Sequence, residues 1–134
     1  MTTSKALDSA ESVRRLLEET FLPTTSGPGI TFLLCDDQCR GKAAVPIDGA
    51  PPDLSFDDRR RIASGFASLA GEEHGALLLV IERAGPESIL QSDIDWLRAM
   101  REACSEHQAR MLGVWLVTPR QAREVALDDL LRVG

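Results

Sequence analysis

The stretch Ala76–Ile81 (ALLLVI) is apolar at every position, and this feature constrains the fold more than any other. A strand carries apolar side chains on both faces only when both faces are covered, as in the centre of a sheet between helices. Met111–Val117 (MLGVWLV) is a second apolar strand. Regular alternation puts Leu112, Val114 and Leu116 on one face and Met111, Gly113, Trp115 and Val117 on the other, and a helix over each face would make Trp115 a core residue. A helical segment lies between the two strands, so we expect a right-handed crossover that makes them parallel neighbours.

A hairpin is predicted ahead of the central strand. Ile30–Cys35 and Lys42–Ile47 are short apolar runs on either side of a polar loop that ends in Gly41. Pro46 has no N–H to donate to a ladder, so the second of these strands should lie at an edge or end there. A short last strand is predicted over Arg123–Leu127.

Helices are predicted where a capping pair precedes apolar residues with helical spacing. Capping boxes are expected at Asp8 with Glu11, at Ser55 with Asp58, and at Ser92 with Asp95. The buried stripes are expected to be Val13, Leu16, Leu17 and Phe21 in a helix over about residues 8–21, Ile62, Phe66 and Leu69 in the second helix, and Ile94, Leu97, Met100 and Cys104, widened by Trp96 and Ala103, in the third.

The first helix is predicted to be loosely attached. Pro23–Gly29 is rich in proline and glycine, a composition that ends a helix and behaves as a linker. We therefore divide the chain into an N-terminal helix with its linker, residues 1–29, and one α/β domain, residues 30–134. The expected architecture of that domain is a mixed sheet with helices on both faces.

Charge and cysteine usage narrow the partners and the compartment. The chain has 15 basic and 21 acidic residues and a net charge of −6, which argues against nucleic acid or an anionic membrane as a partner. No apolar run is long enough for a membrane span, and the first residues lack the apolar core of a signal peptide. The 3 cysteines form no disulfide framework, so we expect reduced thiols and a cytoplasmic location.

The segment from Ala76 to Thr118 (ALLLVIERAGPESILQSDIDWLRAMREACSEHQARMLGVWLVT), preceded by a hairpin and a helix, resembles the JAB/MPN domain in its bacterial RadC-like form. The resemblance implies a cytidine-deaminase-like architecture over about residues 30–127. In that family a buried strand delivers a His-x-His pair that binds zinc, and a Ser-x-x-Asp pair then starts the next helix. Anchored on Ser92 and Asp95, the family spacing assigns the two histidine positions to Glu82 and Ala84.

This sequence departs from the family pattern at the metal and at the base. Alanine has no ligand atom, and Glu82 with Asp95 alone would make a weak oxygen site. The resemblance also implies a glutamate general base before the zinc strand, yet no glutamate lies between Glu19 and Glu72. We therefore expect a non-catalytic module with no bound metal and no cofactor, in which Ser92 and Asp95 remain as a helix cap. A vestigial pocket is expected at Glu82, Ala84, Ser92 and Asp95.

Two other function classes stay open. One is an active JAB-type isopeptidase or peptidase with non-standard ligands, for instance His74, Glu82 and Asp95. The other is a small α/β regulatory domain of a different family. A measurement of bound metal distinguishes the active hydrolase from a non-catalytic module. The strand order distinguishes a regulatory domain of another family from a JAB/MPN-like domain.

Other chemistry-bearing residues have ordinary structural explanations. Cys35 and Cys39, with His74 or His107, are candidate zinc ligands, but a hairpin with incidental cysteines is the simpler reading. Cys104 falls on an apolar stripe, where a buried inert thiol is expected. The charged runs Asp57–Arg61 and Glu72–His74 are expected to be solvated helix faces.

A protein partner is the expected ligand, with a second copy of the chain as one candidate. The loop that leaves the end of a buried strand is where α/β folds bind their ligands. We predict a contact surface made by Arg83, Ile89, Leu90 and Trp96. The alternative is that Ile89 and Leu90 tuck under the third helix and belong to the core. The outer face of that helix is expected to be polar, with Arg98, Arg101, Glu102 and Glu106.

Overall fold

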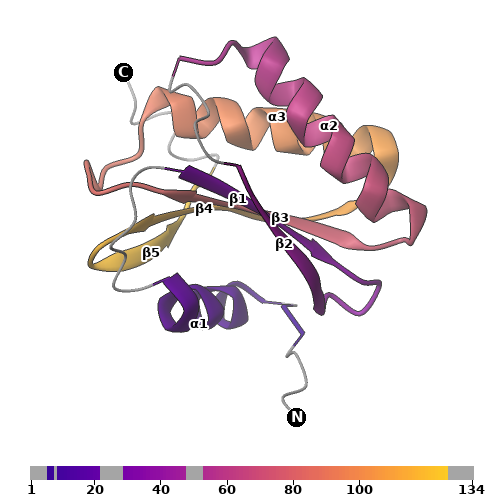
Figure 1. Ribbon diagram of the computed structural model, residues 1–134, viewed down its shortest axis with the longest axis horizontal. Helices are drawn as coiled ribbons and strands as arrows, with labels where there is room; N and C mark the ends of the chain where they lie inside the picture. The colour runs from indigo at the N-terminus through magenta and orange to yellow at the C-terminus, as the bar shows by residue number, and fades with distance from the viewer. Residues whose placement is uncertain (1–5, 8, 22–28, 48–52, 127–134) are drawn as a thin grey trace.

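The computed structural model describes residues 6, 7, 9–21, 29–47 and 53–126. Its elements follow the predicted order: α1 (Ala10–Phe21), β1 (Gly29–Cys35), β2 (Gly41–Ile47), α2 (Phe56–Glu72), β3 (Ala76–Glu82), α3 (Gln91–His107), β4 (Arg110–Thr118) and β5 (Gln121–Glu124). Figure 1 shows one sheet with α2 and α3 above it and α1 below it. The predicted class, an α/β domain with helices on both faces of a mixed sheet, is confirmed.

The sheet has the strand order β2-β1-β3-β4-β5, which puts β3 in the centre. β3 is antiparallel to β1 and parallel to β4, as the crossover through α3 predicts. Every residue of Ala76–Ile81 is buried. The apolar run is therefore the middle of the sheet, with both faces covered.

β2 forms one edge of the sheet, and β5 forms the other. Pro46 lies in β2 opposite Thr31, so the prediction of an edge strand around this proline is confirmed. The last strand is correct in kind but shifted in position. It spans Gln121–Glu124, antiparallel to β4, rather than Arg123–Leu127, whose last residue lies outside the described part of the chain.

α1 is not loosely attached, because its apolar stripe is buried under the sheet. Val13 is 2% exposed and Leu17 is fully buried. Both belong to a cluster that includes Leu78, Trp115 and Val117 from the lower face of the sheet. The predicted cap residue Asp8, most of the predicted linker and the Phe21 side chain lie outside the described residues. Within them, Ser9 and Ser12 exchange hydrogen bonds at the start of the helix, each accepting from the other's backbone N–H at 3.2 Å.

α2 starts as predicted, and its predicted stripe is partly correct, because Ile62 and Phe66 are half-buried and pack against the core above the sheet. Its N-cap Ser55 accepts a hydrogen bond from the backbone N–H of Asp58 at 3.1 Å. Leu69, expected in the core, is 52% exposed. The buried residues are Arg59, Ala63, Ala67 and Ala70. Small residues face α3 because the two helices approach closely: a Cβ on Gly71 would lie 2.1 Å from the carbonyl oxygen of His107.

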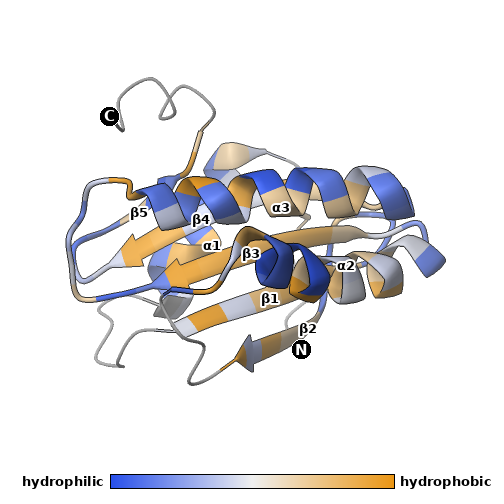
Figure 2. Cartoon of the chain, turned by 90° about the horizontal axis from the view of Figure 1, so that it is seen from above, coloured by the Kyte–Doolittle hydropathy of each residue, from blue (hydrophilic) through white to orange (hydrophobic). Residues whose placement is uncertain are grey.

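α3 buries the predicted stripe, including Trp96 and Ala103. Its outer face is polar, as expected, and part of it is bridged to α2. Arg60 lies 3.3 Å from a carboxylate oxygen of Glu102 and 2.8 Å from one of Glu106. Figure 2 shows the resulting pattern, with apolar colouring along β3 and β4 and hydrophilic stripes on the outward side of α3.

β4 contains a bulge that overturns the predicted assignment of its faces. Leu77 pairs with Met111 and the next residue, Leu78, pairs with Gly113, so Leu112 is an extra residue in the strand. Regular alternation would put Met111 on the side of Trp115, and Leu112 on the side of Val114. The bulge reverses this order. Met111 packs with the core cluster above the sheet, called the upper cluster, which includes Val114 and Leu116, and Leu112 packs with the lower cluster, which includes Trp115. Trp115 is buried, as predicted, at 3% exposure.

Among the described residues, no helix is both long and apolar enough to cross a membrane.

Candidate functional site

The connection from β3 to α3 contains the residues that the sequence singled out, and Arg83 holds it together. The Arg83 guanidinium forms a bidentate pair with Asp93, with Nη1 at 2.7 Å from Oδ1 and Nη2 at 2.9 Å from Oδ2. It also donates to the carbonyl oxygens of Pro86 and Ser88, each at 2.9 Å. The side chains are 13% and 2% exposed, respectively. Arg83 therefore fixes both the loop and the start of the helix.

Asp93, and not the predicted pair of Ser92 and Asp95, caps α3. The helix begins at Gln91, and the Asp93 carboxylate accepts a hydrogen bond from the backbone N–H of Leu90 at 2.7 Å. The prediction failed because the run Gln91–Asp95 offers several polar residues at spacings compatible with a cap. The carboxylate nearest to Arg83 takes the position, since burial of that cation requires a partner.

Asp95 points toward α2 instead. Its carboxylate accepts a hydrogen bond from the Gln91 side chain at 3.1 Å and lies 4.0 Å from Arg59. Arg59 is 4% exposed, although its charged run was expected to be solvated, and its guanidinium carbon lies 5.6 Å from the centre of the Trp96 ring. Arg59 is thus part of the interface between α2 and α3.

The four residues of the predicted vestigial pocket lie in different environments. Glu82 ends β3 and is half-buried, Ala84 is exposed in the loop, and Ser92 and Asp95 are half-buried in the first turns of α3. The described residues contain no group of three or more histidine, cysteine or acidic side chains with metal-binding geometry.

The alternative ligand set of His74, Glu82 and Asp95 is wrong. His74 precedes the start of β3 and Glu82 is its last residue, so the whole strand separates them. At the usual rise per residue this strand is about 20 Å long. No single ion can bind both side chains.

Two of the four residues of the predicted contact surface are buried. Ile89 is 9% exposed and belongs to the upper cluster. Trp96 is 5% exposed and meets the ring of Phe32 edge to face, with centroids 6.0 Å apart. The alternative prediction, that Ile89 and Leu90 both belong to the core, is correct for Ile89 and wrong for Leu90, which is 36% exposed. The Arg83 guanidinium is hydrogen-bonded to Asp93 and to the loop carbonyl oxygens of Pro86 and Ser88.

The cysteines are buried free thiols. Burial raises the pKa of Cys104 to about 11, and burial with smaller contributions from Cys39 and Asp36 raises the pKa of Cys35 to about 11. Cys35 and Cys39 pack in the lower cluster, whereas His107 lies between the upper helices, where its Nε2 is 2.7 Å from the hydroxyl of Ser64. His107 therefore does not complete a zinc site with these thiols.

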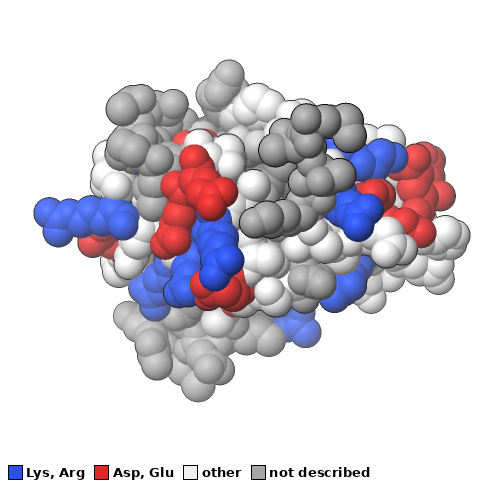
Figure 3. All heavy atoms as spheres, turned by 90° about the horizontal axis from the view of Figure 1, so that it is seen from below, with Lys and Arg blue, Asp and Glu red and all other residues white. Residues whose placement is uncertain are grey.

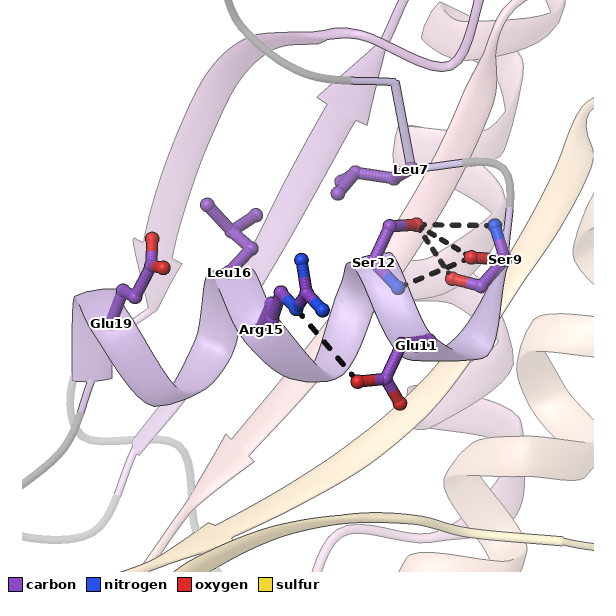
Figure 4. A pocket seen from close by; sticks show the side chains of 7 residues that line it. All are labelled: Leu7, Ser9, Glu11, Ser12, Arg15, Leu16 and Glu19. Carbon is purple, nitrogen blue, oxygen red and sulfur yellow. Dashed lines mark hydrogen bonds and ion pairs between the residues drawn. The ribbon is translucent and has the colours of Figure 1, made fainter.

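The surface hollows differ in whether their polar groups already have partners. Figure 4 shows a hollow along α1 in which Ser9 and Ser12 bond each other and Arg15 lies 3.8 Å from a Glu11 oxygen. On the same side of the molecule, Figure 3 shows basic and acidic groups lying beside one another. A second hollow, between α1 and β5, includes Trp115 and Glu124. The sequence did not predict this hollow, and Gly113 inside an apolar strand is the one feature that marks it.

No protein-family model matches the chain, and no curated protein matches it.

Proposed function

We propose that this chain is a catalytically silent JAB/MPN-like module that uses its scaffold to bind a protein partner. The proposal is supported by the order of elements, by the buried strand followed by Ser92 and Asp95, and by the departure from the family pattern at Glu82 and Ala84. The family's architecture remains part of the proposal, since the fold alone does not identify a family.

The ion pair between Arg83 and Asp93 carries the proposal. The residue between the two expected ligand positions is a cation, and its charge is compensated by a carboxylate of the next helix. Ala84 offers a metal ion no ligand atom. The connection is held by a protein ion pair, and the two positions that the resemblance assigns to zinc ligands carry Glu82 and Ala84.

The same connection supports binding. Residues 84–88 and Leu90 are exposed, whereas Ile89 anchors the loop in the core. Arg83 donates to the loop at Pro86 and Ser88, and Thr118 lies 3.4 Å from the Glu87 carboxylate. A loop held in one conformation loses little conformational entropy on binding, which favours a contact surface. We assign this surface to residues 84–88 with Leu90.

Metal content and hydrolysis test the silent module against the hydrolase. After incubation with zinc and removal of the excess, we expect no stoichiometric zinc in the purified protein and no cleavage of isopeptide or peptide substrates. Elemental analysis and a fluorogenic substrate assay measure the two quantities. About one zinc per chain that survives mild chelation would contradict the proposal, because a structural or catalytic site needs at least three protein ligands.

A further inference from the structure

Cys39 occupies a backbone position that glycine usually takes. The hairpin between β1 and β2 turns through a hydrogen bond from the Cys39 N–H to the Asp36 carbonyl oxygen at 3.0 Å, and one from the Asp36 N–H to the Arg40 carbonyl oxygen at 2.9 Å. The last residue of a three-residue hairpin loop of this kind is left-handed, and Cys39 has a φ of +60°. A side chain there costs free energy that glycine would not cost, and residues held in this way cluster at functional sites.

The thiol of Cys39 contacts a cation. Nη1 of Arg110 donates a hydrogen bond to Sγ of Cys39, with the two atoms 3.2 Å apart. Arg110 begins β4 and is exposed, whereas Cys39 is 3% exposed. The sulfur therefore lies directly beside a side chain that reaches the solvent.

Cys35 lies at the same corner of the sheet. Ala76 of β3 is paired with Cys35 on one side and with Arg110 on the other, and residues paired in register share a face. To reach Cys39 in the hairpin, the Arg110 side chain crosses under Ala76 toward β1. Both cysteines and Ala76 belong to the lower cluster. The two thiols and the guanidinium therefore lie together under one end of the sheet.

The ionisation of Cys35 depends on Cys39. The pKa of Cys35 is raised to about 11, mainly by burial and further by the charges of Cys39 and Asp36. A charge on Cys39 thus acts on Cys35, as expected for two residues that are four apart in a tight hairpin. Cys35 is therefore a protonated thiol close to Cys39.

We propose that Cys35 and Cys39 are a peroxide-sensitive thiol pair that closes to a disulfide. The Cys39 sulfur attacks one oxygen of hydrogen peroxide, which breaks the O–O bond, leaves a sulfenic acid on Cys39 and releases water. The Cys35 sulfur then attacks the Cys39 sulfur, and the Cys35 proton leaves with the hydroxyl group as a second water. Two thiols and one hydrogen peroxide give one disulfide and two waters. This modification site is independent of the proposed protein-binding loop.

Arg110 and Cys104 define what is special about the pair. The Arg110 guanidinium is a positioning residue that stabilises the negative charge on the Cys39 sulfur as it attacks. Cys104 packs in the upper cluster, on the opposite face of the sheet from the other two thiols. We therefore expect Cys104 to stay reduced when the pair is oxidised.

Oxidation of the folded full chain tests the proposal. The reduced protein is treated with a small molar excess of hydrogen peroxide, then unfolded and alkylated with N-ethylmaleimide. We expect alkylation at Cys104 only, and a tryptic peptide of residues 16–40, which contains both other cysteines, that is lighter by two hydrogens than its dithiol form. The proposal is overturned if Cys35 and Cys39 are alkylated, or if Cys39 is oxidised to a sulfinic acid while Cys35 remains a thiol.

Variants assign the roles, with circular dichroism as the check that each is folded. Cys39→Gly suits the left-handed backbone, and it should leave Cys35 open to alkylation after peroxide treatment. Cys104→Ala is the matched control and should close the disulfide at the wild-type rate. Arg110→Met should slow closure about tenfold, because a hydrogen bond from a charged group is lost, and Arg110→Lys should restore most of the rate. A wild-type rate in Arg110→Met would overturn the role of this cation.

Discussion

Arg83 and Asp93 form the most consequential polar contact of the described residues, since both charges are largely removed from water. A buried pair of this kind contributes little compared with apolar residues of the same volume. Removing one partner is different, because it leaves the other charge buried without compensation. Loss of Asp93 would also remove the acceptor for the backbone N–H of Leu90, and loss of Arg83 would remove the donor to the loop carbonyls of Pro86 and Ser88.

The substitution Asp93→Ala should therefore lower the free energy of unfolding by about 3–5 kcal/mol. Asp95→Ala is the matched control, because Asp95 is more exposed and lies 4.0 Å from its basic neighbour. It should cost about 0–1 kcal/mol. Urea denaturation measures both values. Equal losses in the two variants would show that the cap is shared and that Asp93 has no special role.

The buried thiols predict a pH dependence. The pKa values of Cys35 and Cys104 are raised to about 11 from 9.0, so the folded state holds these protons more tightly than the unfolded state. Their contribution to stability is complete below about pH 9 and is lost as the pH rises toward 11. Denaturation midpoints measured from pH 8 to pH 11 should fall, and the double variant Cys35→Ala, Cys104→Ala should fall less steeply. Parallel curves would contradict this origin.

The role of a single residue could be predicted where the local sequence offered only one candidate for that role. Ser55 and Asp58 form the only Ser-x-x-Asp pair before the second helix, and the predicted cap is present there. At the third helix both Asp93 and Asp95 fit a cap, and the choice depends on Arg83, which lies ten residues before Asp93 and reaches it only in the fold. A tertiary partner therefore decided what local spacing left open.

Strands and helices followed from periodicity, but their exact faces did not. The stripes of α3 and the burial of β3 were predicted because large apolar residues repeat there without interruption. Leu69 was misplaced because α2 packs on α3 through alanines, which carry a weak hydropathy signal. The faces of β4 were misassigned because a single extra residue at Leu112 reverses the alternation.

The connection between β3 and α3 is an element in its own right, and two adjacent residues in it allow a direct test of the proposed surface. Leu90→Ser should leave stability within about 0.5 kcal/mol of the wild type, because this side chain is exposed. Ile89→Ser should lower it by about 2–5 kcal/mol, because that side chain belongs to the core.

Affinity capture with the wild type, Leu90→Ser and Arg101→Ser then tests the contact surface. We expect partners of the wild type that are retained by the exposed control variant Arg101→Ser and lost by Leu90→Ser. Capture that is the same with Leu90→Ser as with the wild type would remove this loop as the contact surface, whatever the partner is.

At the scale of the whole molecule, the sequence indicated a covered central strand, a parallel crossover and helices on both faces, and these are present. It did not indicate that α1 belongs to the same core, because a helix separated by a proline-rich segment carries no signal for what it packs on. The pocket between α1 and β5 was out of reach for the same reason. It exists only where a helix, a bulge and an edge strand meet.

Our central proposal is that the chain has a JAB/MPN-like scaffold without the family's metal ligands. Restoring the ligands is its most direct test. In the double variant Glu82→His, Ala84→His, a retained family geometry would bring the two imidazoles beside Asp95, whose carboxylate would turn from Arg59 and supply the third protein ligand of an open zinc site. We predict about one zinc per chain in the double variant, none in Ala84→His alone, and loss of the metal when Asp95→Asn is added. Absence of zinc from the folded double variant, or zinc binding that does not depend on Asp95, would contradict the proposal.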